Sequence, residues 1–265
     1  GDRVAGTSHE AWGFCKKCVV GRYNVGDHFG YTDVHRQFCH NWQGAFAEYV
    51  VLGVKSVFHL PDVLSFQEGA LLDPAAIALH TAERGNISSG DTVVVLGPGP
   101  VGLLAGDAAR ALGAGRVIVV GRGERLAKAA ELGFETVDYA TTDPVETVQG
   151  MTDGVGSDVA LDCAGVPDSY RWALAMLHKG GRCASVGIPV EDVVLSLQDL
   201  VLYEKELVGV RATAGGMRRA MPLVADGRIR VNELHTHTFP LEEFRLAIDT
   251  FNERRDGALK VILEP

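Results

Sequence analysis

Three glycines near the middle of the chain have the spacing of a phosphate-binding turn. Gly97, Gly99 and Gly102 form a G-x-G-x-x-G pattern directly after an apolar run. In such a turn the first glycine allows a tight bend, the second lets the backbone approach a pyrophosphate, and the third lets a helix pack closely on a strand. Free N–H groups at the helix start then bind phosphate oxygens. The pattern predicts a dinucleotide site, although a plain strand–helix turn uses the same glycines. The candidate cofactor-binding residues are Gly97, Gly99, Pro100, Val101 and Gly102.

The next apolar run bears on which dinucleotide is bound. Residues 116–120 end at Gly121, nineteen positions after Gly102. This position meets the adenosine ribose in a dinucleotide-binding unit, and NAD sites usually have Asp or Glu there. Gly121 would make room for a 2′-phosphate instead, and the guanidinium groups of Arg122 and Arg125 can bind one. We therefore favour NADP(H) as the cofactor, with NAD(H) as the alternative. If neither is bound here, the two arginines only solvate a loop.

Two cysteines near the start of the chain, Cys15 and Cys18, stand in a C-x-x-C pattern. The pattern is typical of half a zinc site, of a redox pair, or of two unrelated thiols. No second C-x-x-C follows to complete four ligands. The other cysteines are Cys39, Cys163 and Cys183, and such a scattered set suits a reducing compartment better than a disulfide framework. We therefore expect a cytoplasmic protein.

Alternating elements must hold the glycine turn in place. Apolar, β-branched runs predict strands buried on both faces, and aliphatic residues at helical spacing predict helices between them. This alternation implies an α/β fold with a doubly wound parallel sheet of Rossmann type, whose ligand lies at the carboxyl ends of the strands. Strands are expected at residues 92–96, 116–120, 136–139, 159–163, 182–187 and 207–210, helices at 103–112, 126–132, 143–148 and 168–176, and a turn at Gly180 and Gly181.

Residues after the fourth and fifth strands are further candidates for cofactor binding. Cys163 and Ala164 would lie near the adenosine, and Gly187 and Ile188 near the nicotinamide. Packing of strand ends explains these residue types equally well. The thiols of Cys163 and Cys183 are interpreted as small buried groups rather than nucleophiles.

Bulk properties restrict the class of protein. The formal net charge is −9 and no basic stripe stands out, which argues against a nucleic-acid partner. No apolar run approaches the roughly 18–20 residues that span a bilayer, and no signal peptide is visible, so we expect no membrane partner. A chain of 265 residues can hold one large or two modest domains. It opens at Gly1 without a methionine, and we expect it to be incomplete at its amino end.

Several separate motifs, in the same order and spacing, resemble those of the medium-chain zinc alcohol dehydrogenases. The resemblance covers essentially the whole chain and is greatest to the polyol, threonine and secondary-alcohol branch. It implies a mostly β, GroES-like catalytic domain, split in sequence and partial at its amino end, formed by residues 1–76 and 212–265. A Rossmann dinucleotide-binding domain of residues 77–211 lies between the two parts. The first part is rich in loops and short strands, with one strand expected at 45–51. The motifs lie at residues 1–4, 15–24, 44–50, 60–62, 97–102, 239–241 and 257–261.

The resemblance also implies a catalytic zinc. Its third protein ligand comes from just before the dinucleotide domain, where this chain has Asp73, and a carboxylate can bind zinc. Asp73 followed by Pro74 is equally a helix N-cap signal, and the two roles do not exclude each other. His80 matches a family histidine, but its place inside an apolar helix is more typical of a hydrogen-bonded core histidine than of a metal ligand. The other zinc ligands belong to a family segment that precedes the strand at Gly1.

A structural zinc is not expected. Family members that have one use four cysteines, and the matching positions here are Trp12, Cys15, Cys18 and Gly26. Two thiolates do not complete a tetrahedral site. We therefore interpret Cys15 and Cys18 as loop thiols that remain from such a site.

The resemblance implies zinc-assisted hydride transfer between NADP(H) and an alcohol or ketone, with a small secondary alcohol, polyol or amino alcohol as substrate. Lys260 matches a basic position near the cofactor pyrophosphate, although a solvated strand-edge lysine is equally consistent. A homodimer or homotetramer is expected. Three alternatives remain open: a zinc-free NADPH-dependent double-bond or quinone reductase, a non-catalytic NADP(H)-binding protein, and an inactive fragment of the dehydrogenase.

Overall fold

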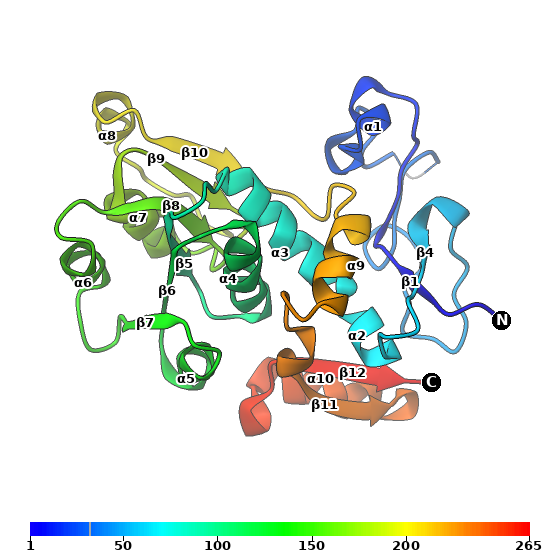
Figure 1. Cartoon of the computed structure of the whole chain (residues 1–265). Coiled ribbons are helices and arrows are strands. Elements are labelled where there is room, and N and C mark those ends of the chain that lie inside the picture. Colours follow the sequence, from blue (N-terminus) through cyan, green and yellow to red (C-terminus); the bar gives the residue numbers. More distant parts are fainter. Residues whose placement is uncertain (32) are drawn as a thin grey trace. The chain divides into compact units, whose positions relative to one another are not determined.

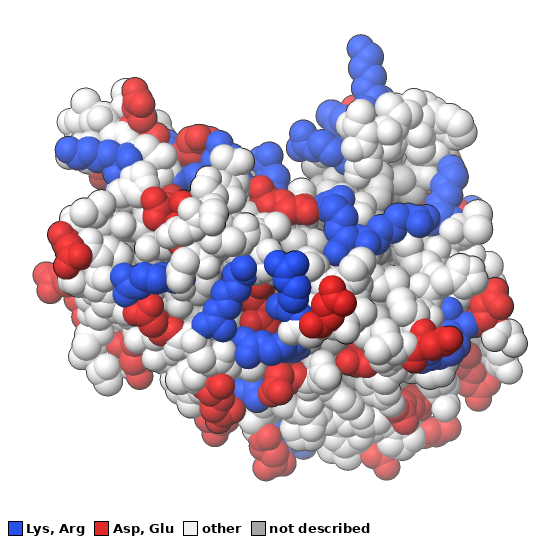
Figure 2. Space-filling model, in the orientation of Figure 1, with Lys and Arg blue, Asp and Glu red and all other residues white. Residues whose placement is uncertain are grey.

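The computed structural model describes residues 1–31 and 33–265, and these form two compact units (Figure 1). The first unit comprises Gly1–Ile77 and Arg211–Pro265, and the second comprises Ala78–Val210. That the first is the catalytic domain and the second the dinucleotide-binding domain stays a prediction. No helix among the described residues is long and apolar enough to cross a membrane. Figure 2 shows basic side chains interspersed with acidic ones on the face that is drawn.

The second unit is built on a six-stranded parallel sheet with the strand order β10-β9-β8-β5-β6-β7. The chain starts in the middle at β5, winds outward through β6 and β7, and returns to the other side at β8. This order is that of a doubly wound dinucleotide-binding fold, with its switch point between β5 and β8. The predicted fold class is therefore confirmed. The strands are β5 (Thr92–Leu96), β6 (Arg116–Gly121), β7 (Glu135–Asp138), β8 (Ser157–Asp162), β9 (Leu177–Ser185) and β10 (Glu206–Gly209).

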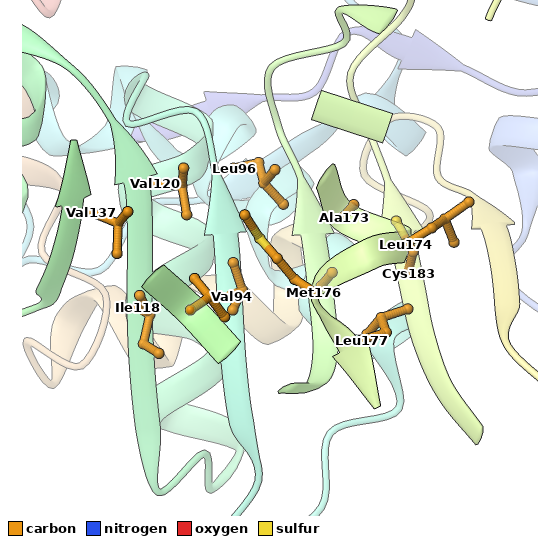
Figure 3. Close-up of a cluster of buried hydrophobic side chains, with 12 residues drawn as sticks. Val94, Leu96, Ile118, Val120, Val137, Ala173, Leu174, Met176, Leu177 and Cys183 are labelled. Atoms are coloured by element: carbon orange, nitrogen blue, oxygen red, sulfur yellow. The ribbon is translucent and has the colours of Figure 1, made fainter. Parts of the chain in front are cut away.

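Both faces of the sheet are buried because helices follow the strands on each side. Alternate residues of β5 point to opposite faces, and Val93, Val94 and Val95 all have an exposed fraction of 0%. One face packs against a helical layer that supplies Ala173 and Met176 (Figure 3). The helices of this unit are α4 (Pro100–Leu112), α5 (Gly123–Glu131), α6 (Pro144–Met151), α7 (Pro167–Met176) and α8 (Leu197–Leu202), while α3 (Leu72–Gly85) runs across the boundary between the units.

The turn expected at Gly180 and Gly181 lies inside β9 as an irregularity. Ser157 pairs with Leu177, whereas Val159, two residues later in β8, pairs with Arg182. The extra residues of β9 therefore leave the ladder as a bulge, for which Gly180 adopts a φ of 81°. The glycines mark a real deviation of the chain, but β9 is longer than the predicted fifth strand.

The residues of the first unit that the structure describes form three two-stranded sheets. β1 (Val4–Gly6) pairs with β4 (Val57–His59), β2 (His9–Glu10) with β3 (Arg36–Gln37), and β11 (His235–Pro240) with β12 (Lys260–Glu264). Its α-helices are α1 (Lys16–Val19), α2 (Phe66–Ala70), α9 (Met217–Ala225) and α10 (Phe244–Glu253). Short 3₁₀ segments are Tyr23–Val25, Val54–Ser56, Val231–Leu234, Leu241–Glu243 and Arg255–Gly257.

The strand predicted at residues 45–51 is wrong. This segment is irregular, and within the described part of the chain no strand pairs with it. Phe46 is 65% exposed and Tyr49 is 89% exposed. A strand is stable only when a neighbour satisfies its backbone groups. The aromatic and β-branched residues of this segment are typical of strands, but none of the described strands supplies a pairing partner.

Candidate functional site

The first and third glycines of the turn after β5 are fixed by contacts within the protein. Gly97 has a φ of 94°, and its N–H donates to the carbonyl of Val120 at 2.9 Å. A Cβ on Gly97 would lie 3.0 Å from the Cβ of Ala164, and a Cβ on Gly102 would lie 2.0 Å from the carbonyl oxygen of Gly97. Only glycine fits at either place. The turn therefore has the tight bend and the close strand–helix packing that the spacing predicts.

The second glycine is different, because the space beside it is open. Gly99 is the N-cap of α4 with a φ of −74°, and the nearest atom to a Cβ built there is Nη1 of Arg125, at 3.8 Å. Pro100 opens the helix and has no N–H. The helix itself offers no acceptor to the N–H groups of Val101 and Gly102. Amide donors, the positive end of a helix dipole and a guanidinium thus meet at one open position, which suits a phosphate group.

The residues at the end of β6 lie at the carboxyl ends of the strands, as the glycine turn does. A Cβ on Gly121 would lie 2.3 Å from the ring of Pro98, so the missing side chain makes room for that proline rather than for a phosphate. Gly121 also places no carboxylate at the end of β6. Arg122 is exposed, and its guanidinium carbon lies 5.6 Å from the ring centre of Tyr139. With Arg125 at the glycine turn, two guanidinium groups lie near the carboxyl ends of β5, β6 and β7.

The loops after β8 and β9 touch each other through glycine. A Cβ on Gly187 would lie 2.3 Å from the nitrogen of Gly165, and a Cβ on Gly165 would lie 2.7 Å from the nitrogen of Ile188. Ala164 is exposed, and Ile188 is 80% exposed. The predicted cofactor-binding residues of the second unit are therefore brought together at one edge of the sheet. They comprise the glycine turn, the end of β6 and these two loops.

The side chain of Asp162 joins the same two loops, and sequence reasoning missed it. Asp162 is fully buried at the end of β8. Its Oδ1 accepts the N–H groups of Ala164 and Gly165, both at 3.2 Å, and its Oδ2 accepts the hydroxyl of Ser185 at 2.8 Å. A buried carboxylate needs such partners. The sequence contained a signal for this role. Asp162 lies in a strand that is predicted to be buried, and a buried carboxylate must accept hydrogen bonds from neighbouring groups.

Ser185→Ala is expected to lower the free energy of unfolding by about 1–2 kcal/mol, because it removes a donor from a buried carboxylate. The Ser185 hydroxyl oxygen also lies 2.8 Å from the hydroxyl of Tyr170, which donates to the carbonyl of Gly187 at 2.8 Å. Urea unfolding measures the change, with the exposed Ser89→Ala as the control. Equal stability of the two variants would contradict the importance of this bond.

The cysteines near the site have the character of buried packing groups. The N–H of Cys163 donates to the carbonyl of Leu96 at 2.9 Å, which ties β8 to the switch point. Burial raises the pKa of both the Cys163 and the Cys183 thiols well above their ordinary value. Both are therefore neutral thiols at physiological pH, as expected for residues that are not nucleophiles.

In the first unit, Asp73 lies at the end of a row of hydroxyl groups. Its Oδ1 accepts the hydroxyl of Thr7 at 3.2 Å and the N–H of Ser8 at 3.5 Å. The Thr7 hydroxyl lies 3.5 Å from that of Thr213, which is 3.0 Å from the hydroxyl of Tyr23. These contacts join the residues that follow β1, the loop at 213 and the segment at 23 around one carboxylate.

Asp73 does not act as the N-cap of α3. The helix begins at Leu72, one residue earlier, and the carboxylate bonds to the β1 segment instead. Burial raises the pKa of Asp73, while the N–H of Ser8 and the charge of Lys260 act in the opposite direction. Burial likewise lowers the pKa of Lys260, opposed by the charge of Asp73. Lys260 thus faces Asp73 within the first unit, and its role at a pyrophosphate stays a prediction.

One candidate from the sequence, His80, remains to be placed. His80 lies in the part of α3 that belongs to the second unit, with Nδ1 3.8 Å from the carboxylate of Glu83. Its side chain is 11% exposed, as expected for a partnered core histidine. Among residues 1–31 and 33–265, no group of three or more His, Cys, Asp or Glu side chains is arranged to hold a metal. The described residues therefore do not complete a zinc site around Asp73.

Comparison with known proteins agrees with this geometry. The sequence profile of the family described as Zinc-binding dehydrogenase matches residues 100–226. Sorbitol dehydrogenase of Bacillus subtilis (strain 168) is 32% identical over 268 residues, which cover 100% of this chain and 74% of that protein. L-threonine 3-dehydrogenase of Alteromonas mediterranea is 31% identical, with 100% and 76% covered. A zinc-binding dehydrogenase from Sinorhizobium meliloti 1021, solved bound to NADP, superposes with a TM-score of 0.90 at 31% identity, covering 100% of this chain and 77% of that one.

The chain belongs to the zinc-dependent medium-chain alcohol dehydrogenase superfamily. It is an oxidoreductase of the alcohol or polyol dehydrogenase type. The resemblance inferred from the separate sequence motifs is thereby confirmed.

Proposed function

We propose that this protein transfers a hydride between NADP(H) and a small alcohol or its ketone. The observation that carries the proposal is the open position at Gly99, where helix-start amides and the guanidinium of Arg125 converge. A phosphate group is the chemical partner that this arrangement fits. The relative solved bound to NADP supports the choice of nucleotide.

Each group of residues at the carboxyl ends of the strands has a role in this proposal. The N–H groups at the start of α4 bind the pyrophosphate, and Arg122 and Arg125 bind the 2′-phosphate. Asp162 holds the loops after β8 and β9 in register, so that Ile188 lies beside the nicotinamide. The nicotinamide supplies the hydride chemistry, while the protein contributes binding and orientation. The second unit is then the dinucleotide-binding domain and the first unit the catalytic domain.

The substrate is proposed as a secondary alcohol, polyol or amino alcohol, since relatives are named sorbitol dehydrogenase and L-threonine 3-dehydrogenase. A saturable change in NADPH fluorescence with the intact protein, followed by NADP⁺ reduction with a panel of such alcohols, tests the proposal. Reduction of activated double bonds without alcohol oxidation would support the reductase alternative. Binding without any turnover would support the non-catalytic one. A homodimer or homotetramer in the cytoplasm completes the proposal and is measured by light scattering and cell fractionation.

Arg122→Asp is expected to shift the preference for NADPH over NADH by at least tenfold, about 1.4 kcal/mol. The change removes a guanidinium from the 2′-phosphate and adds a repelling carboxylate. Dissociation constants for both nucleotides measure it. Lys179→Asp is the matched control, because it makes the same charge change in the bulge of β9. This bulge lies near the amino end of its strand, whereas the glycine turn follows the carboxyl end of β5. An unchanged NADPH to NADH ratio in the Arg122 variant would refute the phosphate assignment.

Asp73→Ala is expected to lower the zinc content of the protein as it is encoded, including any residues before Gly1. One carboxylate is not a site, so this proposal concerns Asp73 only as one of several ligands. Metal analysis of the purified protein measures zinc per chain. Asp62→Ala, an exposed acidic change in the same unit, is the control. Retention of zinc in the Asp73 variant would reduce Asp73 to a hydrogen-bonding partner of Thr7 and Ser8.

A further inference from the structure

The C-x-x-C pair is a chemically reactive sequence motif that the proposed dehydrogenase chemistry does not use. Cys15 is buried at the start of α1, and Cys18 is half-buried one turn later. Their Sγ atoms lie 3.3 Å apart. A disulfide has an S–S length of about 2.05 Å. The two sulfurs therefore need to approach by little more than about 1 Å, which side-chain rotation provides.

The surroundings favour an ionised sulfur at Cys15. The N–H groups of Cys18 and Asp27 point at its Sγ, at 3.4 and 3.5 Å. The N–H of Asp27 is the main cause that lowers the pKa of the Cys15 thiol. The backbone N–H groups of Cys18 and Lys17 lower the pKa of this thiol as well. A thiolate of this kind is the form that reacts with oxidants and with other sulfurs.

Space beside the sulfurs makes the pair reachable. A Cβ on Gly26 would lie 3.0 Å from the Sγ of Cys18 and 3.7 Å from that of Cys15. As a glycine, residue 26 places no side chain against the two sulfurs. Cys18 also lines a cavity of about 170 Å³, whose wall includes His9, Tyr23 and Lys55. A water molecule occupies about 30 Å³ in the liquid. A small oxidant can therefore lie against Cys18 within the first unit.

From this geometry we infer that Cys15 and Cys18 form a reversible thiol–disulfide couple, a modification site oxidised by a peroxide. One thiolate attacks a peroxide oxygen, becomes a sulfenic acid and releases water after protonation. The second thiol attacks that sulfur as it gives up its proton and expels the remaining oxygen as hydroxide, which takes up that proton and forms a second water. Two thiols and one hydrogen peroxide give one disulfide and two waters, and a dithiol reductant reverses the change. The inference does not depend on nucleotide binding.

The test uses the intact protein with Cys39→Ser as background, since Cys39 is an exposed thiol that would react by itself. The native protein is treated with one equivalent of hydrogen peroxide, quenched in acid, alkylated and mapped by mass spectrometry. We expect a loss of two hydrogens per chain, one peptide containing a Cys15–Cys18 disulfide, and full recovery of both thiols with dithiothreitol. In a dithiothreitol redox buffer the two thiols should disappear together as one two-electron couple.

Cys18→Ser and Cys18→Ala should abolish the disulfide and leave Cys15 as a single sulfenic acid that dimedone traps. Circular dichroism confirms that these variants are folded, and the half-buried position of Cys18 makes both substitutions mild. Independent alkylation of Cys15 and Cys18 after peroxide treatment would overturn the inference. Protection of both thiols by a bound metal, released by a chelator, would overturn it as well. Cys163 and Cys183 serve as internal controls, because the raised pKa of both thiols should keep them reduced throughout.

Discussion

The Gly99→Ala protein is expected to fold normally and to bind NADPH at least a hundredfold more weakly, a loss of about 2.7 kcal/mol. Alanine tolerates the φ of −74° at this position, and the nearest atom to the new methyl group would be 3.8 Å away. The unliganded protein therefore has room for the methyl group. A pyrophosphate does not, because it must approach the backbone at this glycine.

Two other glycines show whether the effect is specific to the ligand. Gly150→Ala is the matched control, since Gly150 lies in α6 with no atom within 4 Å of a Cβ built there. It should leave NADPH binding unchanged and raise the stability slightly, by about 0.5–1 kcal/mol, because alanine favours a helix more than glycine does. Gly102→Ala should instead destabilise the fold, because its methyl group would meet a carbonyl oxygen at 2.0 Å. Fluorescence titration and thermal unfolding separate these results. Unchanged NADPH affinity in the Gly99 variant would end the assignment of the turn to phosphate binding.

The second large effect expected is a loss of stability in mild acid, caused by His9. This side chain is 2% exposed, and its Nδ1 lies 3.2 Å from Nε2 of His35. Its Nε2 is buried without a hydrogen-bond partner among the described residues. Burial, followed by the charges of His35, Arg211 and His40, lowers the pKa of His9 from 6.5 to about 4. The folded protein thus holds this imidazole neutral.

The direction of the pH effect follows from the lowered pKa. The unfolded chain takes up a proton near pH 6.5, whereas the folded chain resists protonation until about pH 4. The contribution of His9 is therefore complete above pH 6.5 and is lost as the pH falls from 6.5 to 4. The loss amounts to about 3 kcal/mol, because one pKa unit corresponds to about 1.4 kcal/mol.

His9→Gln should flatten this part of the pH profile, since glutamine can still bond to His35 but does not titrate. Urea unfolding between pH 4 and 7.5 provides the measurement. His59→Gln is the control, because His59 is exposed. Parallel profiles for the natural and His9→Gln proteins would show that the acid sensitivity arises elsewhere.

The sheet was predictable because its signals are local. Runs such as residues 92–96 and 116–120 are continuous and apolar, and a strand buried on both faces needs nothing else to be recognised. Gly97 and Gly102 were predictable for the same reason, since their spacing encodes contacts within one turn. The motif resemblance extended these local signals to the order of the whole chain.

The rest depended on contacts between residues distant in sequence. Glycine is needed at position 121 because the ring of Pro98 occupies the space of a side chain. The partner of Asp162 is Ser185, 23 residues later. Asp73 looked like a helix cap because Pro74 follows it, but Thr7 and Ser8 of another segment bond to its carboxylate. The strand expected at 45–51 failed in the same way, because the residue types of one segment do not decide whether a neighbouring strand pairs with it.

The contact between Gly121 and Pro98 has a consequence for protein engineering. The usual way to convert a dinucleotide enzyme to NAD(H) places an acidic side chain at the end of the second strand. Here the first carbon of such a side chain would overlap a proline ring by more than 1 Å, given a separation of 2.3 Å where about 3.4 Å is ordinary contact. Exchange of the proposed NADP(H) preference therefore involves two residues, Gly121 and Pro98. Gly121→Asp introduced together with Pro98→Ala should succeed where Gly121→Asp by itself misfolds the turn.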